Sequence, residues 1–155
     1  MTGIPKIRKA NVLDVPAIAD LINTHALKGI MLQRPISRIY DNIRDYLVIE
    51  DENGVVACGA LHVTWADLAE IRSLAVREDS LRQGYGRLLV DQFMKEAEIL
   101  MVKRVFALTY QDEFFRKMGF AEIDKAKLPH KIWSECINCI HFPNCNEIAM
   151  LKELS

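Results

Sequence analysis

One stretch, from Glu70 to Leu89, constrains this chain more than any other. Its first seven residues, Glu-Ile-Arg-Ser-Leu-Ala-Val, carry the β-branched and bulky apolar side chains of a buried strand. Its last part opens a helix with Leu89 and Phe93 among its apolar positions, and a polar turn with Gly84 and Gly86 lies between. This succession makes an anion site, because glycine lets the backbone approach a ligand and the first helical N–H groups lack partners. An ordinary strand-to-helix turn can have the same spacing, so both readings stay open here.

Length and composition predict one globular domain over residues 1–155. A chain of 155 residues that is 50% hydrophobic and 26% charged can bury a single core. The formal net charge of -1 gives no indication of a nucleic-acid partner. The first eight residues do not have the shape of a signal peptide, and no apolar run approaches the ~20 residues of a membrane span. We therefore expect a cytoplasmic protein that binds neither nucleic acid nor membrane.

The hydrophobic pattern predicts a mixed α/β fold, with one sheet covered by helices on both faces. The expected strands are 6–9, 46–50, 55–63, the segment from Glu70, 104–110, 120–123 and 147–154. The expected helices are one capped by Asp14, one over 36–46, a long one after Gly86 and a short one over 113–118. The long helix should direct Leu89, Phe93, Ala97 and Leu100 toward the core. Residues 128–146 are predicted to form an irregular, cysteine-containing insertion.

The stretch from Glu70 resembles the acetyl-CoA signature of the GNAT superfamily of N-acetyltransferases. The matching residues are Glu-Ile-x-x-Leu-Ala-Val, an arginine-bearing loop and Gly-Tyr-Gly-x-x-Leu-Leu, together with Phe-Phe-Arg-Lys-Met-Gly-Phe at 114–120 and the order of the elements. The family usually has Gln or Arg where this chain has Leu81, a change that leaves the backbone amides of the loop in place. The resemblance implies the GNAT fold with acetyl-CoA as cosubstrate. It places cofactor contacts at Leu74, Ala75, Val76, Arg82, Gln83, Gly84, Tyr85, Gly86, Arg87 and Phe115.

Further stretches are similar to the short, single-domain bacterial amino-acid N-acetyltransferases and to the acetyltransferase half of N-acetylglutamate synthase. They are residues 29–34, 57–62, 67–72, 104–110, 113–115 and 128–131. This resemblance implies acetylation of the α-amine of an amino acid, L-glutamate or glutamine, as the first step of arginine biosynthesis. It also places a substrate-side arginine at Arg34.

Glu70 is the predicted general base. Strict strand alternation would place it on the face of Arg72, Leu74 and Val76, opposite Ile71. A carboxylate half-buried in a cleft has its pKa raised toward neutral pH, so it can take a proton from the amine directly or through water. If the strand splays from its neighbour, as it does in the family, a backbone N–H near Leu74 to Val76 would polarise the thioester carbonyl. The alternative is a solvent-facing glutamate at a strand end.

The general acid and the acceptor-binding cations are less directly indicated. Many GNAT enzymes have a tyrosine where this chain has Phe115, which cannot donate a proton. Tyr110 is therefore the candidate general acid. The alternatives are that solvent protonates the thiolate, and that Tyr110 is only an aromatic side chain at the rim. The α-carboxylate of an amino acid needs a fixed cation, and a bidentate arginine suits it. Arg34, Arg72 and Lys28 are the candidates, although each is equally compatible with a solvated charge or a structural ion pair.

Three cysteines near the C-terminal end form a candidate metal site. Cys136 and Cys139 have the spacing of a chelating pair, and Cys145 with His130 or His141 would complete four ligands for a structural zinc ion. We favour buried thiols instead, because the spacing between Cys139 and Cys145 is not that of a standard zinc knuckle. The GNAT resemblance requires no catalytic metal.

Two other functions remain open at this stage. A GNAT enzyme for another small amine, such as a polyamine, or for a peptide N-terminus would need carboxylates around the acceptor, whereas Lys28, Arg34 and Arg72 favour an anionic one. A non-catalytic acyl-CoA sensor fits the missing tyrosine, while Glu70 and the intact glycine loop argue against it. A homodimer is the candidate assembly, with the last strand and the loop around Trp133 as contact surfaces.

Overall fold

The structure is a computed structural model that describes residues 5–28, 34–128 and 147–154. The strands are β1 (Lys6–Lys9), β2 (Tyr46–Asp51), β3 (Gly54–Trp65), β4 (Leu68–Val76), β5 (Arg104–Thr109), β6 (Ala121–Ile123) and β7 (Ile148–Glu153). The α-helices are α1 (Val15–Leu27), α2 (Ile36–Asp41), α3 (Tyr85–Ile99) and α4 (Asp112–Lys117). Short 3-10 helices are η1 (Val12–Asp14), η2 (Ile43–Asp45), η3 (Glu78–Ser80) and η4 (Lys125–Lys127).

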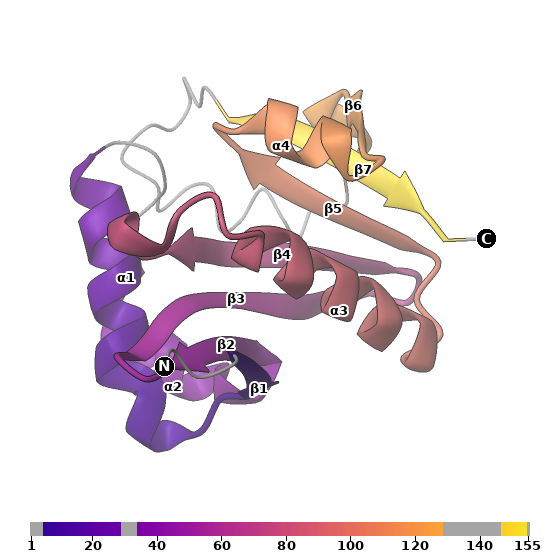
Figure 1. The fold of residues 1–155 in the computed structure, drawn as a ribbon. Helices are drawn as coiled ribbons and strands as arrows, with labels where there is room; N and C mark the ends of the chain where they lie inside the picture. The colour runs from indigo at the N-terminus through magenta and orange to yellow at the C-terminus, as the bar shows by residue number, and fades with distance from the viewer. Residues whose placement is uncertain (1–4, 29–33, 129–146, 155) are drawn as a thin grey trace.

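The strands form one seven-stranded mixed sheet in the order β1-β2-β3-β4-β5-β7-β6. The helices cover it on both faces, with α3 and α4 on one and α1 and α2 on the other (Figure 1). Neighbouring strands are antiparallel except β4 and β5, which run parallel within the sheet that the structure describes. A parallel neighbour requires a crossover, which α3 supplies. The predicted mixed α/β fold is confirmed.

The parallel pair separates along its length. Its register joins Leu68 to Arg104 and ends where Glu70 lies opposite Phe106, although β4 continues to Val76 and β5 to Thr109. Figure 1 shows the two arrows diverging beyond this point. The splay expected from the family resemblance is therefore present, and it leaves one edge of β4 open beside the start of α3.

A β-bulge in β4 corrects the predicted face assignment. Cys58 lies opposite Ala75 and Ala60 opposite Arg72, so two residues of β4 face Gly59 alone. Ser73, in the bulge, has a φ of 56°, in the left-handed region. Strict alternation fails here.

Because of the bulge, Leu74 and Val76 lie with Ile71 on the α3 face, whereas Glu70 and Arg72 lie on the opposite face. The prediction that Glu70, Leu74 and Val76 share a face is wrong for this reason.

The core has a layer on each face of the sheet. On the α3 face, Leu89, Phe93 and Ala97 are fully buried against the sheet, as predicted from their spacing. Leu100 was expected to join them, but it follows the last residue of α3 and is 52% exposed. On the other face, α1 and α2 pack over Tyr46 and the strand residues around it.

Asp14 does not cap α1 as predicted, because its carboxylate is engaged elsewhere. It accepts the N–H of Asn11 at 2.8 Å in a capping box of η1, and α1 begins at Val15 with no side-chain cap bond from Asp14. It also accepts a hydrogen bond from the Arg8 guanidinium at 2.8 Å, and this partner holds the pKa of Asp14 below its usual value. The predicted helix over 36–46 is likewise broken, into α2 and η2.

Gly59 is packed so closely that a larger residue should destabilise the protein. A Cβ atom there would lie 2.9 Å from Cε2 of Phe93 and 3.0 Å from Cδ1 of Leu74. We expect Gly59→Ala to lower the free energy of unfolding by about 1–3 kcal/mol, measured by urea denaturation, because the core must shift. In a Phe93→Leu background, Gly59→Ala should lower the free energy of unfolding by less than it does in the wild type, because the ring edge that the new Cβ atom would meet is gone. An unchanged urea midpoint in Gly59→Ala would contradict this packing.

No helix among the described residues is long and apolar enough to cross a membrane.

Candidate active site

A cavity of about 680 Å³ opens where β4 and β5 separate. Its lining combines the β4 end, the loop into α3, the end of β5, α4 and the end of α1. The lining residues are His25, Lys28, Arg34, Glu70, Ile71, Arg72, Ser73, Leu74, Val76, Glu78, Ser80, Leu81, Arg82, Gly84, Tyr85, Gly86, Arg87, Ala107, Leu108, Thr109, Tyr110, Gln111, Phe114, Phe115, Lys117 and Glu147. Most of the residues predicted from the sequence are thus brought to one hollow.

The loop before α3 presents backbone amides at one end of the cavity. Arg82 and Gly84 have φ angles of 66° and 81°, and Gly84 is the N-cap residue directly before α3. The first helical hydrogen bond runs from the Leu88 N–H to the Gly84 carbonyl at 3.0 Å. The N–H groups of residues 85–87 therefore precede the helical ladder, at the positive end of the α3 dipole. This arrangement suits an anionic ligand such as a phosphate.

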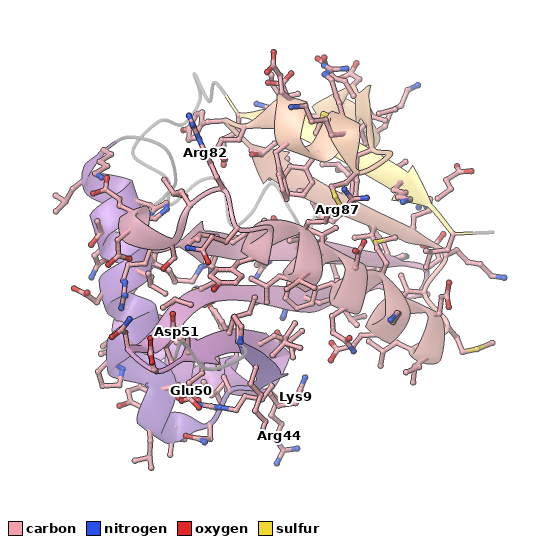
Figure 2. All side chains as sticks on the ribbon, viewed as in Figure 1. Lys9, Arg44, Glu50, Asp51, Arg82 and Arg87 are labelled. Carbon is pink, nitrogen blue, oxygen red and sulfur yellow. The ribbon has the colours of Figure 1, made fainter. Side chains whose placement is uncertain are left out.

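Two exposed arginines add charge to that end of the cavity. Figure 2 shows Arg82 on the loop that leads into α3 and Arg87 on the first turn of the helix. Both line the cavity. Guanidinium groups beside unpaired amides favour a phosphate or pyrophosphate over a neutral ligand.

The aromatic residues of α4 form a wall beside this loop. The Phe114 and Phe115 rings meet edge to face with centroids 5.1 Å apart, and Phe115 packs in the same way on Phe120 at 5.2 Å. A Cβ atom on Gly86 would lie 3.2 Å from Cζ of Phe114. The second glycine of the motif therefore gives α3 close contact with the wall, whereas Gly84 supplies the left-handed turn.

Glu70 and Arg72 form a buried ion pair on the face of β4 opposite α3. Their side chains are only 10% and 8% exposed, and Arg72 Nε donates to Glu70 Oε1 at 2.6 Å. The pair thus lies at the point where β4 leaves β5, on the lining of the cavity.

The two other predicted cations differ in their partners. Lys28 is paired with Glu78 at the rim of the cavity. Arg34 lines the cavity half-buried and makes no ion pair with any residue that the structure describes. Tyr110 lies half-buried on the same lining, directly after β5.

The end of β4 presents a backbone donor to the cavity. The N–H of Arg77 donates to the Val56 carbonyl of β3 at 2.8 Å. Alternate residues of an antiparallel strand direct their backbone groups to opposite edges, so the Val76 amide faces the edge where β5 is no longer paired. A carbonyl oxygen in the cleft would meet this N–H group.

Two predicted cofactor residues do not line the cavity. Ala75 is 2% exposed and packs in the core under α1, opposite Cys58. Gln83 is exposed, and its Oε1 accepts the hydroxyl proton of Tyr85 at 3.1 Å. Ala75 faces away from the cavity because side chains alternate along β4 after the bulge. The side chain of Gln83 is instead hydrogen-bonded to Tyr85.

Sequence reasoning missed several lining residues, among them His25, Ser73 and Glu147. His25 lies on the buried face of α1, and burial lowers the pKa of its imidazole; the charge of Lys28 acts in the same direction. Glu147 is 8% exposed just before β7. The amphipathic spacing of α1 could have indicated His25, whereas the place of Ser73 depends on the bulge and that of Glu147 on the pairing of strands.

The candidate zinc ligands Cys136, Cys139 and Cys145 lie outside the described residues. Within the ranges that the structure describes, no cluster of His, Cys, Asp or Glu side chains could hold a metal ion. Cys58 is buried and free there, and desolvation raises the pKa of its thiol to about 12.

The profile of the acetyltransferase (GNAT) domain matches residues 42–122. The chain belongs to the GNAT acetyltransferase family. An uncharacterized N-acetyltransferase of Chlorobaculum tepidum is 41% identical over 96% of this GNAT chain and 96% of its own. An amino-acid acetyltransferase of Mycobacterium tuberculosis is 39% identical over 84% of this chain and 76% of its own.

Solved structures agree with the family assignment. Rv2747 of Mycobacterium tuberculosis, in complex with CoA and NLQ, is 34% identical with a TM-score of 0.84 over 97% of this chain and 99% of its own. The N-acetylglutamate synthase of Neisseria gonorrhoeae, complexed with coenzyme A and N-acetyl-glutamate, has a TM-score of 0.86 at 27% identity. That match covers 99% of this chain and 36% of the synthase, so this GNAT chain corresponds to about a third of the longer protein.

Proposed function

We propose that this protein transfers the acetyl group of acetyl-CoA to the α-amine of an amino acid, L-glutamate or glutamine, as the first step of arginine biosynthesis. The observation that carries the proposal is the course of the cavity, which runs from the amide loop at 84–87 to the Glu70–Arg72 pair. The Mycobacterium tuberculosis relative is named an amino-acid acetyltransferase, and the two structural neighbours are complexed with CoA and NLQ or N-acetyl-glutamate; both facts support the proposal. We also propose that residues 1–155 act as one catalytic domain.

The cofactor would lie along the start of α3. The amides of Tyr85, Gly86 and Arg87 would hold the pyrophosphate, with Arg82 and Arg87 as cationic partners. Leu74 and Val76 line the cavity from the open edge of β4, and Phe115 from α4. The thioester oxygen would accept the Val76 amide, which stabilises negative charge as the carbonyl is attacked.

Glu70 would act as the general base. It removes a proton from the acceptor ammonium, directly or through water, and the neutral amine attacks the thioester carbon. A C–N bond forms, the nitrogen of the tetrahedral intermediate loses its second proton to solvent, the C–S bond breaks, and CoA leaves as a thiolate that takes up a proton. Tyr110 lies on the β5 side of the same cavity and is the proposed donor of that proton.

The acceptor carboxylate would bind Arg34, which makes no ion pair with a residue that the structure describes. Arg72 and Lys28 are further cations on the same cavity lining. Lys28 is already paired with Glu78 and Arg72 with Glu70. An incoming carboxylate can therefore bind Arg34 without breaking either of these ion pairs. This favours an acceptor with a carboxylate over a polyamine.

A panel of acceptors tests the proposal. Release of free CoA thiol from acetyl-CoA is measured with L-glutamate, L-glutamine, L-aspartate, L-arginine and spermidine. We expect glutamate or glutamine to give the highest kcat/KM and spermidine to give none. Preferred turnover of spermidine would indicate an enzyme for another amine, and tight acetyl-CoA binding without turnover would indicate an acyl-CoA sensor.

A further inference from the structure

Ser73 combines an unusual backbone conformation with a place in the cavity lining. Its φ of 56° lies in the left-handed region, where a residue with a Cβ atom is strained. Glycine takes such a bulge position without that strain. Among the described residues, Gly54, Gly84 and Gly119 have a positive φ, as do three residues with a Cβ atom, Ser73, Arg82 and Met101. Ser73 is the one of these three that lies in a strand, half-buried on the wall of the cavity.

Two side chains from neighbouring strands hold Ser73 in place. Tyr46 Oη of β2 donates to Ser73 Oγ at 3.4 Å, and the Cys58 thiol of β3 donates to the Ser73 carbonyl at 3.5 Å. Tyr46 is 2% exposed, and burial raises the pKa of its phenol, so it is a neutral hydrogen-bond donor. When Ser73 Oγ accepts from Tyr46, its own proton is left to donate elsewhere.

The surroundings of this hydroxyl indicate what it would meet. Two cationic side chains, Arg34 and Arg72, line the same cavity as Ser73. Arg72 precedes Ser73 in β4. A donor hydroxyl that shares a cavity with two guanidinium groups is suited to a carboxylate or amide oxygen.

We propose that Ser73 Oγ donates a hydrogen bond to an oxygen of the acceptor amino acid, and that Tyr46 positions the hydroxyl for it. The proposal rests on the amino-acid acetyltransferase function above and adds a contact that sets the affinity for the acceptor. Ser73 takes no part in proton transfer. The left-handed conformation is the means by which β4 presents this side chain to the cavity.

Ser73→Gly separates the contact from a structural role. Glycine relieves the backbone strain and removes the small CH2OH side chain with its hydroxyl, so the variant should have a Tm at or above that of the wild type. We expect the KM for the acceptor, L-glutamate or L-glutamine, to rise about tenfold or more while the KM for acetyl-CoA stays within about twofold. Tyr46→Phe, which keeps the ring, should raise the acceptor KM by a smaller factor of about three.

Met101→Gly is the matched control. Met101 has a φ of 66°, is 77% exposed, follows the C-cap of α3 and is not among the residues that line the cavity. It should show the same tolerance of glycine with both KM values unchanged. An active wild type whose Ser73→Gly variant keeps its acceptor KM, or loses acetyl-CoA affinity instead, overturns this proposal alone. A wild type that acetylates no amino acid overturns the proposed function and this contact together.

Discussion

Glu70→Gln is expected to lower kcat by about a hundredfold or more while the KM for acetyl-CoA stays within about twofold. The glutamine keeps the shape of the side chain but cannot take the ammonium proton. The carboxylate is buried at the point where β4 leaves β5, far along the cavity from the amide loop, so cofactor binding should not depend on it. Steady-state kinetics from pH 6 to 9 would measure the loss.

The expected cost in stability must be separated from the loss of catalysis. Removing one partner of a buried pair leaves Arg72 with a weaker counterpart, so the Tm of Glu70→Gln should fall. Glu50→Gln is the matched control, because Glu50 also pairs with an arginine, Arg8, at 3.0 Å but does not line the cavity. It should retain kcat. A Glu70→Gln enzyme with wild-type kcat across this pH range would exclude Glu70 as the base.

Gly86→Val should abolish measurable acetyl-CoA binding. A Cβ atom at this position already lies 3.2 Å from Cζ of Phe114, and valine adds two methyl groups between the start of α3 and the aromatic wall. The helix start must then move, which carries the amides of 85–87 away from a pyrophosphate. Isothermal titration calorimetry with acetyl-CoA should show at least about a hundredfold weaker binding.

The control for Gly86→Val is a glycine substitution of similar structural cost outside the cavity. Gly54 has a φ of 99° at the β2–β3 turn, so Gly54→Ala introduces backbone strain there without contacting the site. It should lower the Tm and leave acetyl-CoA affinity unchanged. If Gly86→Val binds acetyl-CoA as tightly as the wild type, the loop at 84–87 is not the pyrophosphate site.

Local patterns in the sequence were sufficient to predict most helices and strands and the glycine-bearing turn before α3. The spacing of Leu89, Phe93 and Ala97 predicts the buried face of α3, since a helix repeats its contacts every three to four residues. Glycine at 84 and 86 predicts the turn, because its geometry depends on the residues within it. Helix ends were less accurate, as the exposure of Leu100 and the engagement of Asp14 by Arg8 show.

The acceptor end of the cavity could not be predicted in the same way. The bulge at Ser73 arises from the register of β4 against β3, and it moves Leu74 and Val76 to the opposite face from Glu70. A register shift of one residue moves every following side chain to the other face of the sheet, and no single residue of β4 indicates that shift in the sequence. The pairing of Lys28 with Glu78, like the placement of Glu147, depends on segments that meet only in the folded chain.

The most direct test of the account is the identity of the product. Acetyl-CoA is incubated with the protein and L-glutamate or L-glutamine, and the products are analysed by mass spectrometry and NMR. We predict one acetyl group on the α-nitrogen of the amino acid and one free CoA for each acetylated molecule. CoA release without an acetylated amino acid, or an acetyl group on an amine other than the α-amine of an amino acid, would contradict the account.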